Sequence, residues 1–189
     1  MSGFGDSAAD AGRYADVLAA ASSSANTNVE MLGESFKMVA PVAGALGYSL
    51  EDTSLALGLM ANAGIKSSQS GTSLRSSLTN LVKPTKAMAD TMKDLGIEVT
   101  DANGEMKPLE ELLRHLRDRF SNLDEAQKAS AAATIFGKEA MSGMLAVINA
   151  SDADFDNLSQ SINNSNGAAE RMAKTMQDNA RGAMVELRS

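Results

Sequence analysis

SLEDTSLALGLMANAG, residues 49–64, contains the longest hydrophobic run of the chain, from Leu55 to Ala63. Ser49 is a favoured residue type for a helix N-cap, and acidic residues follow it in the first turn, where the helix dipole stabilises negative charge. Gly64 is the residue type that most often ends a helix. The run is far shorter than the roughly 20 apolar residues that span a bilayer. The stretch therefore predicts a short helix in a soluble protein.

Similar helix signals precede this stretch. A helix is predicted from Ala8 to Ala21, and the serine run at residues 22–24 is typical of a hinge. Thr27, followed three residues later by Glu30, fits a capping box at the start of the next helix. Apolar residues of that helix recur at steps of three and four and form one face. Pro41 lies inside it, so we expect a kink or a division there.

Further helices are predicted after residue 64, each bounded by a capping residue, a proline or a glycine. Their expected ranges are about 68–82, 85–95, 108–120, 124–136, 138–149 and 151–162, with a final helix after residue 167. Residues 97–107 differ, because Ile97, Val99 and Met106 flank an Asn103-Gly104 pair. Such a pair between short extended pieces is a hairpin signal.

The predicted fold class is all-α: a compact multi-helix domain with one small β-hairpin. The expected parts are an N-terminal helix and hinge at 1–24, a helical core domain at 25–165 with the hairpin near 97–107, and a C-terminal helix at 166–189. That last helix has no stop signal, so we expect it to continue in the full protein.

The last helix carries a single thin apolar stripe at steps of three and four. A stripe of this width buries too little to hold an isolated helix in water. It must pack on the domain, on a second copy or on further chain. Our prediction is self-association, centred on Met176 and Met184, and the candidate residues are Met172, Met176, Met184 and Leu187.

Composition excludes several classes of function. The chain has 17 Lys and Arg against 24 Asp and Glu, for a net charge of −7, which argues against sequence-independent binding to nucleic-acid phosphates. It has no cysteine and one histidine. Thiolate metal sites and Cys–His pairs are therefore excluded, and catalytic sites built on several histidines as well. We predict no catalytic residue, no metal and no cofactor.

Three local patterns resemble ligand sites but fail on spacing. Asp152, Asp154 and Asp156 alternate as in a calcium loop, yet the glycine and glutamate that such a loop needs at positions six and twelve are missing. Gly64-Ile65-Lys66-Ser67 and Gly137-Lys138 lack the spacing of a phosphate-binding loop. The favoured interpretations are carboxylates at a helix N-terminus and glycines at helix ends. His115 is interpreted as part of a solvated helix face.

Several stretches together resemble the core region of phage tail tape-measure proteins. The densest is LGLMANAGIKSSQSGTSLR, residues 57–75, followed by LVKPT at 81–85. Others lie at residues 96–109, around DANG, and at 135–143, IFGKEAMSG. Upstream, residues 14–19 and 39–43 are similar as well. The positions that carry the resemblance are Gly64, Ile65, Lys66, Gly71, Leu74, Arg75, Lys83, Pro84, Asn103, Gly104, Phe136 and Gly137.

The resemblance implies a structural role in a bacteriophage or prophage tail. Members of this family lie inside the growing tail, set its length and leave ahead of the DNA at infection. The implied location is the virion tail interior, and the host cytoplasm during assembly. The implied partners are the tail tube, tail assembly chaperones and tail tip proteins, with a homo-oligomer and a transient envelope contact as further expectations. A continuous helix of 189 residues would span only about 280 Å, so this broken chain is a domain and not itself the ruler.

Two other classes remain open from the residues alone. One is a virion-associated peptidoglycan hydrolase segment, since spacing alone does not decide whether two carboxylates form a catalytic pair. The other is a helical scaffold of a related contractile injection system. The absence of a marked acidic pair favours the structural role.

Overall fold

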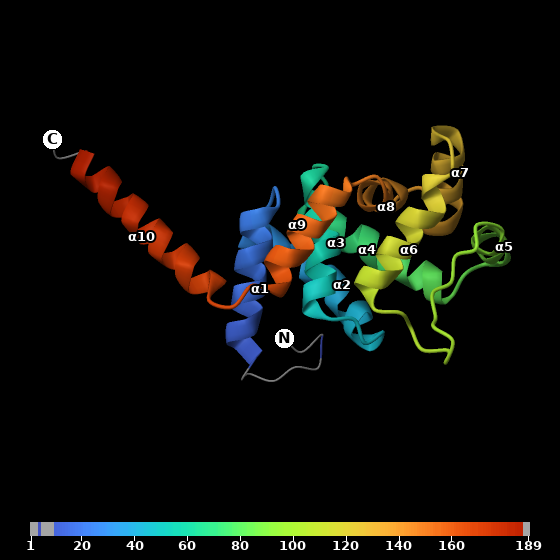
Figure 1. The fold of residues 1–189 in the computed structure, drawn as a ribbon, viewed down its shortest axis with the longest axis horizontal. Helices are drawn as coiled ribbons and strands as arrows, with labels where there is room; N and C mark the ends of the chain where they lie inside the picture. Colours follow the sequence, from blue (N-terminus) through green and yellow to red (C-terminus); the bar gives the residue numbers. More distant parts are fainter. Residues whose placement is uncertain (1–3, 5–9, 187–189) are drawn as a thin grey trace.

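The computed structural model describes residue 4 and residues 10–186, with side chains placed up to Arg181. The described residues form ten helices and no strand (Figure 1), which confirms the all-α class. The helices are α1 (Ala11–Ser24), α2 (Val29–Ala45), α3 (Leu50–Asn62), α4 (Ser67–Val82), α5 (Lys86–Asp94), α6 (Leu109–Ser121), α7 (Glu125–Phe136), α8 (Met141–Ile148), α9 (Asp152–Asn163) and α10 (Ala168–Glu186). No helix among the described residues is both long enough and apolar enough to cross a membrane.

Helix α3 is the centre of the molecule. Ser49 caps it by accepting a hydrogen bond from the backbone N–H of Asp52 at 3.0 Å, and Gly64 follows its end with a φ of +87°. Residues 53–61 are all buried, because α1, α4, α6, α8 and α9 surround the helix. A helix that is apolar all round is expected inside a core and not at its edge.

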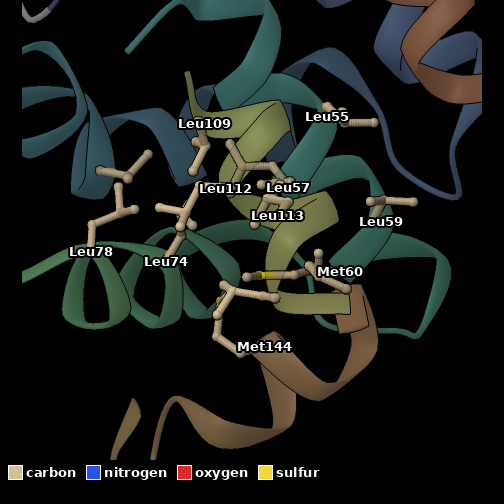
Figure 2. Close-up of a cluster of buried hydrophobic side chains, with 14 of the residues drawn as sticks. Leu55, Leu57, Leu59, Met60, Leu74, Leu78, Leu109, Leu112, Leu113 and Met144 are labelled. Atoms are coloured by element: carbon tan, nitrogen blue, oxygen red, sulfur yellow. The ribbon is translucent and has the colours of Figure 1, made fainter. Parts of the chain in front are cut away.

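The core is built around α3 from leucine and methionine (Figure 2). Leu57 and Met60 of α3 lie with Leu74 of α4, and α6 and α8 contribute Leu112 and Met144. All of these side chains are at most 1 % exposed. Burial of a leucine-sized side chain contributes about 1.5–3 kcal/mol, so the meeting of four helices at this cluster is a main source of stability.

Helices α2 and α4 make the most extensive helix–helix contact of the fold. Gly71 faces the backbone of Ser35, where a Cβ atom would lie 2.1 Å from the Ser35 carbonyl oxygen. The buried Ser35 hydroxyl lies 2.7 Å from the Ser67 carbonyl oxygen and 2.8 Å from the Ser70 hydroxyl. Glycine and serine therefore allow the two backbones to approach each other closely.

Two local expectations were wrong, and of the kink or division expected at Pro41 the division is excluded. The serine run at 22–24 belongs to α1 and is no hinge, since the hydroxyls of Ser22 and Ser23 donate to the Ala19 carbonyl within the helix. Asn28 and not Thr27 caps α2, accepting from the Met31 backbone N–H at 2.8 Å. Pro41 does not divide α2, which runs on to Ala45.

The predicted β-hairpin at residues 97–107 was also wrong. The segment is a turn with a single antiparallel bridge between Thr100 and Met106. The Asp101 carboxylate holds it by accepting from the backbone N–H groups of Asn103 and Glu105 at 2.8 and 3.0 Å, an Asx-type turn. Strands cannot extend, because Pro108 offers no N–H group and α6 begins immediately after it.

Candidate functional site

Helix α10 projects away from the other helices (Figure 1). We call α10 the arm and helices α1 to α9 the body. It packs mainly on α1, through its first turns. Met172 is half-buried, whereas the side chains of residues 173–181 are all exposed, and Met176 is 66 % exposed. Of the other self-association candidates, the Met184 side chain and Leu187 lie outside the described residues. The described part of the arm thus covers the start of its apolar stripe on α1 and leaves Met176 exposed.

An apolar groove runs between α1 and α10. Tyr14, Ala15 and Leu18 of α1 line one wall, and Ala169, Met172, Ala173 and Met176 line the other. Val29 at the start of α2 also lines the groove and is 42 % exposed. The groove continues the stripe of α10 onto the body, so the exposed apolar surface of the arm and that of the body form one patch.

A carboxylate from α1 anchors the start of the arm. The Asp16 Oδ2 atom accepts from the Gly167 backbone N–H and Oδ1 from the Ala169 N–H, both at 2.9 Å. These hydrogen bonds, Ala169 first, hold the pKa of Asp16 below its ordinary value of 3.8. The nearby Arg171 charge acts in the same direction. The carboxylate therefore stays ionised at the positive end of the α10 dipole.

A second polar cluster joins α6 to α8 and α9. The Arg117 guanidinium donates to the carbonyl oxygens of Val147 and Ala150 at 3.1 and 2.6 Å and to Asp152 at 2.6 Å. It also lies 5.0 Å from the centre of the Phe155 ring. These bonds satisfy carbonyl groups at the C-terminal end of α8, which have no partner within the helix. Because both terminal nitrogens of Arg117 donate to groups of the protein, we assign it a structural role.

Asp52 on α3 caps α6 from outside that helix. Its Oδ2 atom accepts from the Glu110 backbone N–H at 3.3 Å. Burial raises the pKa of Asp52 above 3.8. The hydrogen bond from the Glu110 backbone lowers this pKa, whereas the negative charge of Glu110 raises it further. The buried Tyr48 hydroxyl finds no hydrogen-bond partner among the described residues. Burial together with the Asp52 charge raises the pKa of Tyr48 to about 12.

We expect Asp52→Asn to stabilise the protein at neutral pH. A carboxyl whose pKa is raised by folding contributes stability below its unfolded pKa and loses it as pH rises through the folded pKa. The amide oxygen of asparagine still accepts from Glu110, but it carries no charge. Urea unfolding of both proteins from pH 3 to 7 should therefore show a variant advantage that grows with pH. A variant that is less stable at pH 7 would contradict the assignment.

The residues that carry the family resemblance do not converge on one site. Gly64, Gly104 and Gly137 adopt positive φ values at turns or helix ends. Leu74 and Phe136 are buried in the core. The rest lie in α4 or in connections between helices; they are Ile65, Lys66, Gly71, Arg75, Lys83, Pro84 and Asn103. These positions are compatible with a structural role for the motifs.

Side chains of the aspartate pattern and His115 make ion pairs and hydrogen bonds to other groups of the chain. Asp152 and Asp156 pair with Arg117 and Arg114, and Asp154 accepts a hydrogen bond from Ser151, the N-cap of α9. The Nε2 atom of His115 accepts from the Glu98 backbone N–H at 3.0 Å. Among the residues that the structure describes, no group of three or more His, Asp or Glu side chains is placed to hold a metal ion.

Comparison with known proteins identifies the family. The sequence model of the family described as phage-related minor tail protein matches residues 1–137, which span α1 to α7. The chain is 44 % identical to the tape measure protein of Pneumococcus phage Dp-1 over 176 residues. This aligned stretch covers 93 % of this chain and 15 % of the phage Dp-1 protein. It is 31 % identical to the probable tape measure protein of Escherichia phage P2 over 170 residues. That aligned stretch covers 88 % of this chain and 21 % of the phage P2 protein.

No solved structure matches the chain. The chain corresponds to only a fraction of each relative, 15 % and 21 % of their lengths. The family match nevertheless covers more than half of this chain, and both relatives bear the tape measure name that the sequence motifs had suggested. The chain belongs to the phage-related minor tail protein family.

Proposed function

We propose that this chain is a structural, non-enzymatic domain of a phage tail tape-measure protein that contributes to tail-length determination, tail assembly and genome delivery. The observation that carries the proposal is the difference between body and arm in their polar contacts and exposed apolar surface. Within the body, Arg114 and Arg117 pair with the acidic residues of α9, whereas α10 exposes Met176 and an apolar groove beside it. Such a domain is suited to docking on other proteins and not to chemistry.

The proposed partners follow from the location of a tape measure. They are the tail tube, the tail assembly chaperones and the tail tip, in the host cytoplasm during assembly and in the tail interior afterwards, with a transient contact with the envelope at infection. A homo-oligomer is the first of these contacts to test, because in the sequence the apolar spacing of Met172 and Met176 continues to Met184 and Leu187. A thin stripe needs a second surface before it can stabilise a helix.

We expect the chain to self-associate through α10, and Met176→Glu to weaken this association. The charge would be desolvated wherever the stripe is covered, and the 66 % exposed Met176 makes no contribution to the core. Gln177→Glu adds the same charge on an exposed neighbouring position and is the matched control. Light scattering across a concentration series measures the mass of each protein.

The expected result is an oligomer for the native chain and the Gln177→Glu variant, and a smaller species for Met176→Glu with an unchanged helical circular dichroism spectrum. A native chain that stays monomeric at the highest concentration would exclude self-association through α10.

A peptidoglycan zymogram tests the non-enzymatic assignment. It should show no clearing at the position of the chain, and a clearing band there would overturn the assignment.

A further inference from the structure

The N-terminus of α10 receives its cap from a distant part of the chain. Gly167, which precedes the helix, has no side chain with which to cap it, so the backbone N–H groups of the first turn need another acceptor. Asp16 supplies both of its carboxylate oxygens to the N–H groups of Gly167 and Ala169, across separations of 151 and 153 residues. Two hydrogen bonds from one planar carboxylate fix a direction as well as a position.

The surroundings of this contact make Gly167 the point at which the arm can turn. Its φ of +71° lies in the left-handed region, which glycine enters without steric cost. Arg171 braces the turn by donating from its guanidinium to the Asn166 carbonyl oxygen at 2.9 Å. Further along the arm the side chains of residues 173–181 are exposed, so this part of α10 adds little burial that would oppose a rotation.

We infer that Asp16 is a positioning residue that clamps α10 and sets the direction in which the arm leaves the body, with Gly167 as the pivot. Without the carboxylate, the two N–H groups bond to water, and apolar packing on α1 is left to hold the arm. The arm then samples a range of directions. This device goes beyond the proposed function, because it operates within one copy of the chain whatever partner α10 meets.

The experiment measures the distance between arm and body by double electron–electron resonance. The chain has no cysteine, so Gln177→Cys on α10 and Asn157→Cys on α9, both exposed, give one spin-labelled pair. Dilution with unlabelled chain removes distances between copies. We compare this protein with the same protein carrying Asp16→Ala or, as a control, Glu139→Ala, which removes one charge from an exposed residue outside the helices.

The expected result is a narrow distance distribution for the native sequence and for Glu139→Ala, and a broad or displaced one for Asp16→Ala. An unchanged distribution in Asp16→Ala overturns the inference. If Asp16→Ala does not fold, Asp16→Asn decides, since its amide oxygen keeps one of the two bonds. Hydrogen exchange at one of the two amides, Gly167 or Ala169, should then accelerate about tenfold, and unchanged exchange at both would overturn the clamp.

These outcomes are independent of self-association. If the native chain is a monomer whose arm is rigid, and the arm becomes mobile in Asp16→Ala, the clamp is supported and self-association is excluded. An oligomer that persists with a mobile arm in Asp16→Ala supports both. The two proposals therefore fail on different measurements.

Discussion

Gly71→Ala is expected to destabilise the protein by more than about 3 kcal/mol, at the upper end of the range for overpacked interiors. The added Cβ atom would lie 2.1 Å from the carbonyl oxygen of Ser35 and 2.8 Å from its carbonyl carbon. Both are backbone atoms of α2, so no side-chain rotation relieves the clash. Helices α2 and α4 must separate, and the buried hydrogen bond between the Ser35 and Ser70 hydroxyls is lost with them. Urea denaturation followed by circular dichroism measures the effect.

Gly33→Ala is the matched control, because Gly33 lies in α2 as well and an added Cβ would meet no atom within 4 Å. Alanine favours a helix over glycine by about 0.8–1.0 kcal/mol, so this variant should unfold at a higher urea concentration than the native chain. If the two variants shift the midpoint in the same direction, the close approach of α2 and α4 is not what requires glycine at position 71.

Phe120→Ala should cost about 3–5 kcal/mol, the usual range for removing a buried aromatic side chain. Phe120 ends the apolar face of α6, is fully buried and stacks on Phe136 of α7, with ring centroids 6.4 Å apart. Truncation leaves a cavity where α6 and α7 meet and removes the aromatic pair, which is worth about 0.5–1.5 kcal/mol by itself.

Thermal unfolding by calorimetry tests this second prediction. Phe36→Ala is the comparison, since Phe36 is only half-buried and its loss leaves no closed cavity. We expect Phe120→Ala to lower the melting temperature much further than Phe36→Ala does. Equal shifts would show that the α6–α7 contact carries little of the stability of the fold.

Helix positions were predictable because the signals at their ends are local. Ser49, Asp124 and Ser151 cap the helices that follow them, and Gly64 and Gly137 end helices with positive φ. Residues 97–107 misled the prediction, because an Asn-Gly pair signals a turn but not the length of the strands beside it. There the side chain of Asp101 made the turn without any strand.

The contacts that assemble the helices were not predictable in the same way. Asp16, Asp52 and Arg117 each satisfy the end of a helix far away in the sequence, and a single sequence holds no record of such pairs. One indirect signal existed: Pro108 and Gly167 precede helices but carry no side chain that can cap them. Backbone groups at a helix start need an acceptor, so both positions indicated a partner from elsewhere.

The stripe of the last helix was found from spacing alone, but its exposure was not. Met172 and Met176 are one helical turn apart and equally apolar. Met172 is half-buried and Met176 is 66 % exposed, because α10 diverges from α1 beyond its first turns (Figure 1). Which part of an amphipathic helix remains free depends on the direction in which the helix leaves the body, and that is a tertiary property.

The packing of α1 has a consequence for synthesis on the ribosome. Its contacts with α9 and α10 join residues about 150 positions apart, as the Asp16–Gly167 hydrogen bond shows. At about 5–20 residues per second, α1 waits on the order of 10–30 seconds for those partners to be translated. During that time the buried residues Val17 and Ala21 lack part of their cover. The nascent chain is thus prone to aggregate at α1, and a holding chaperone that covers α1 until α10 has emerged would prevent this.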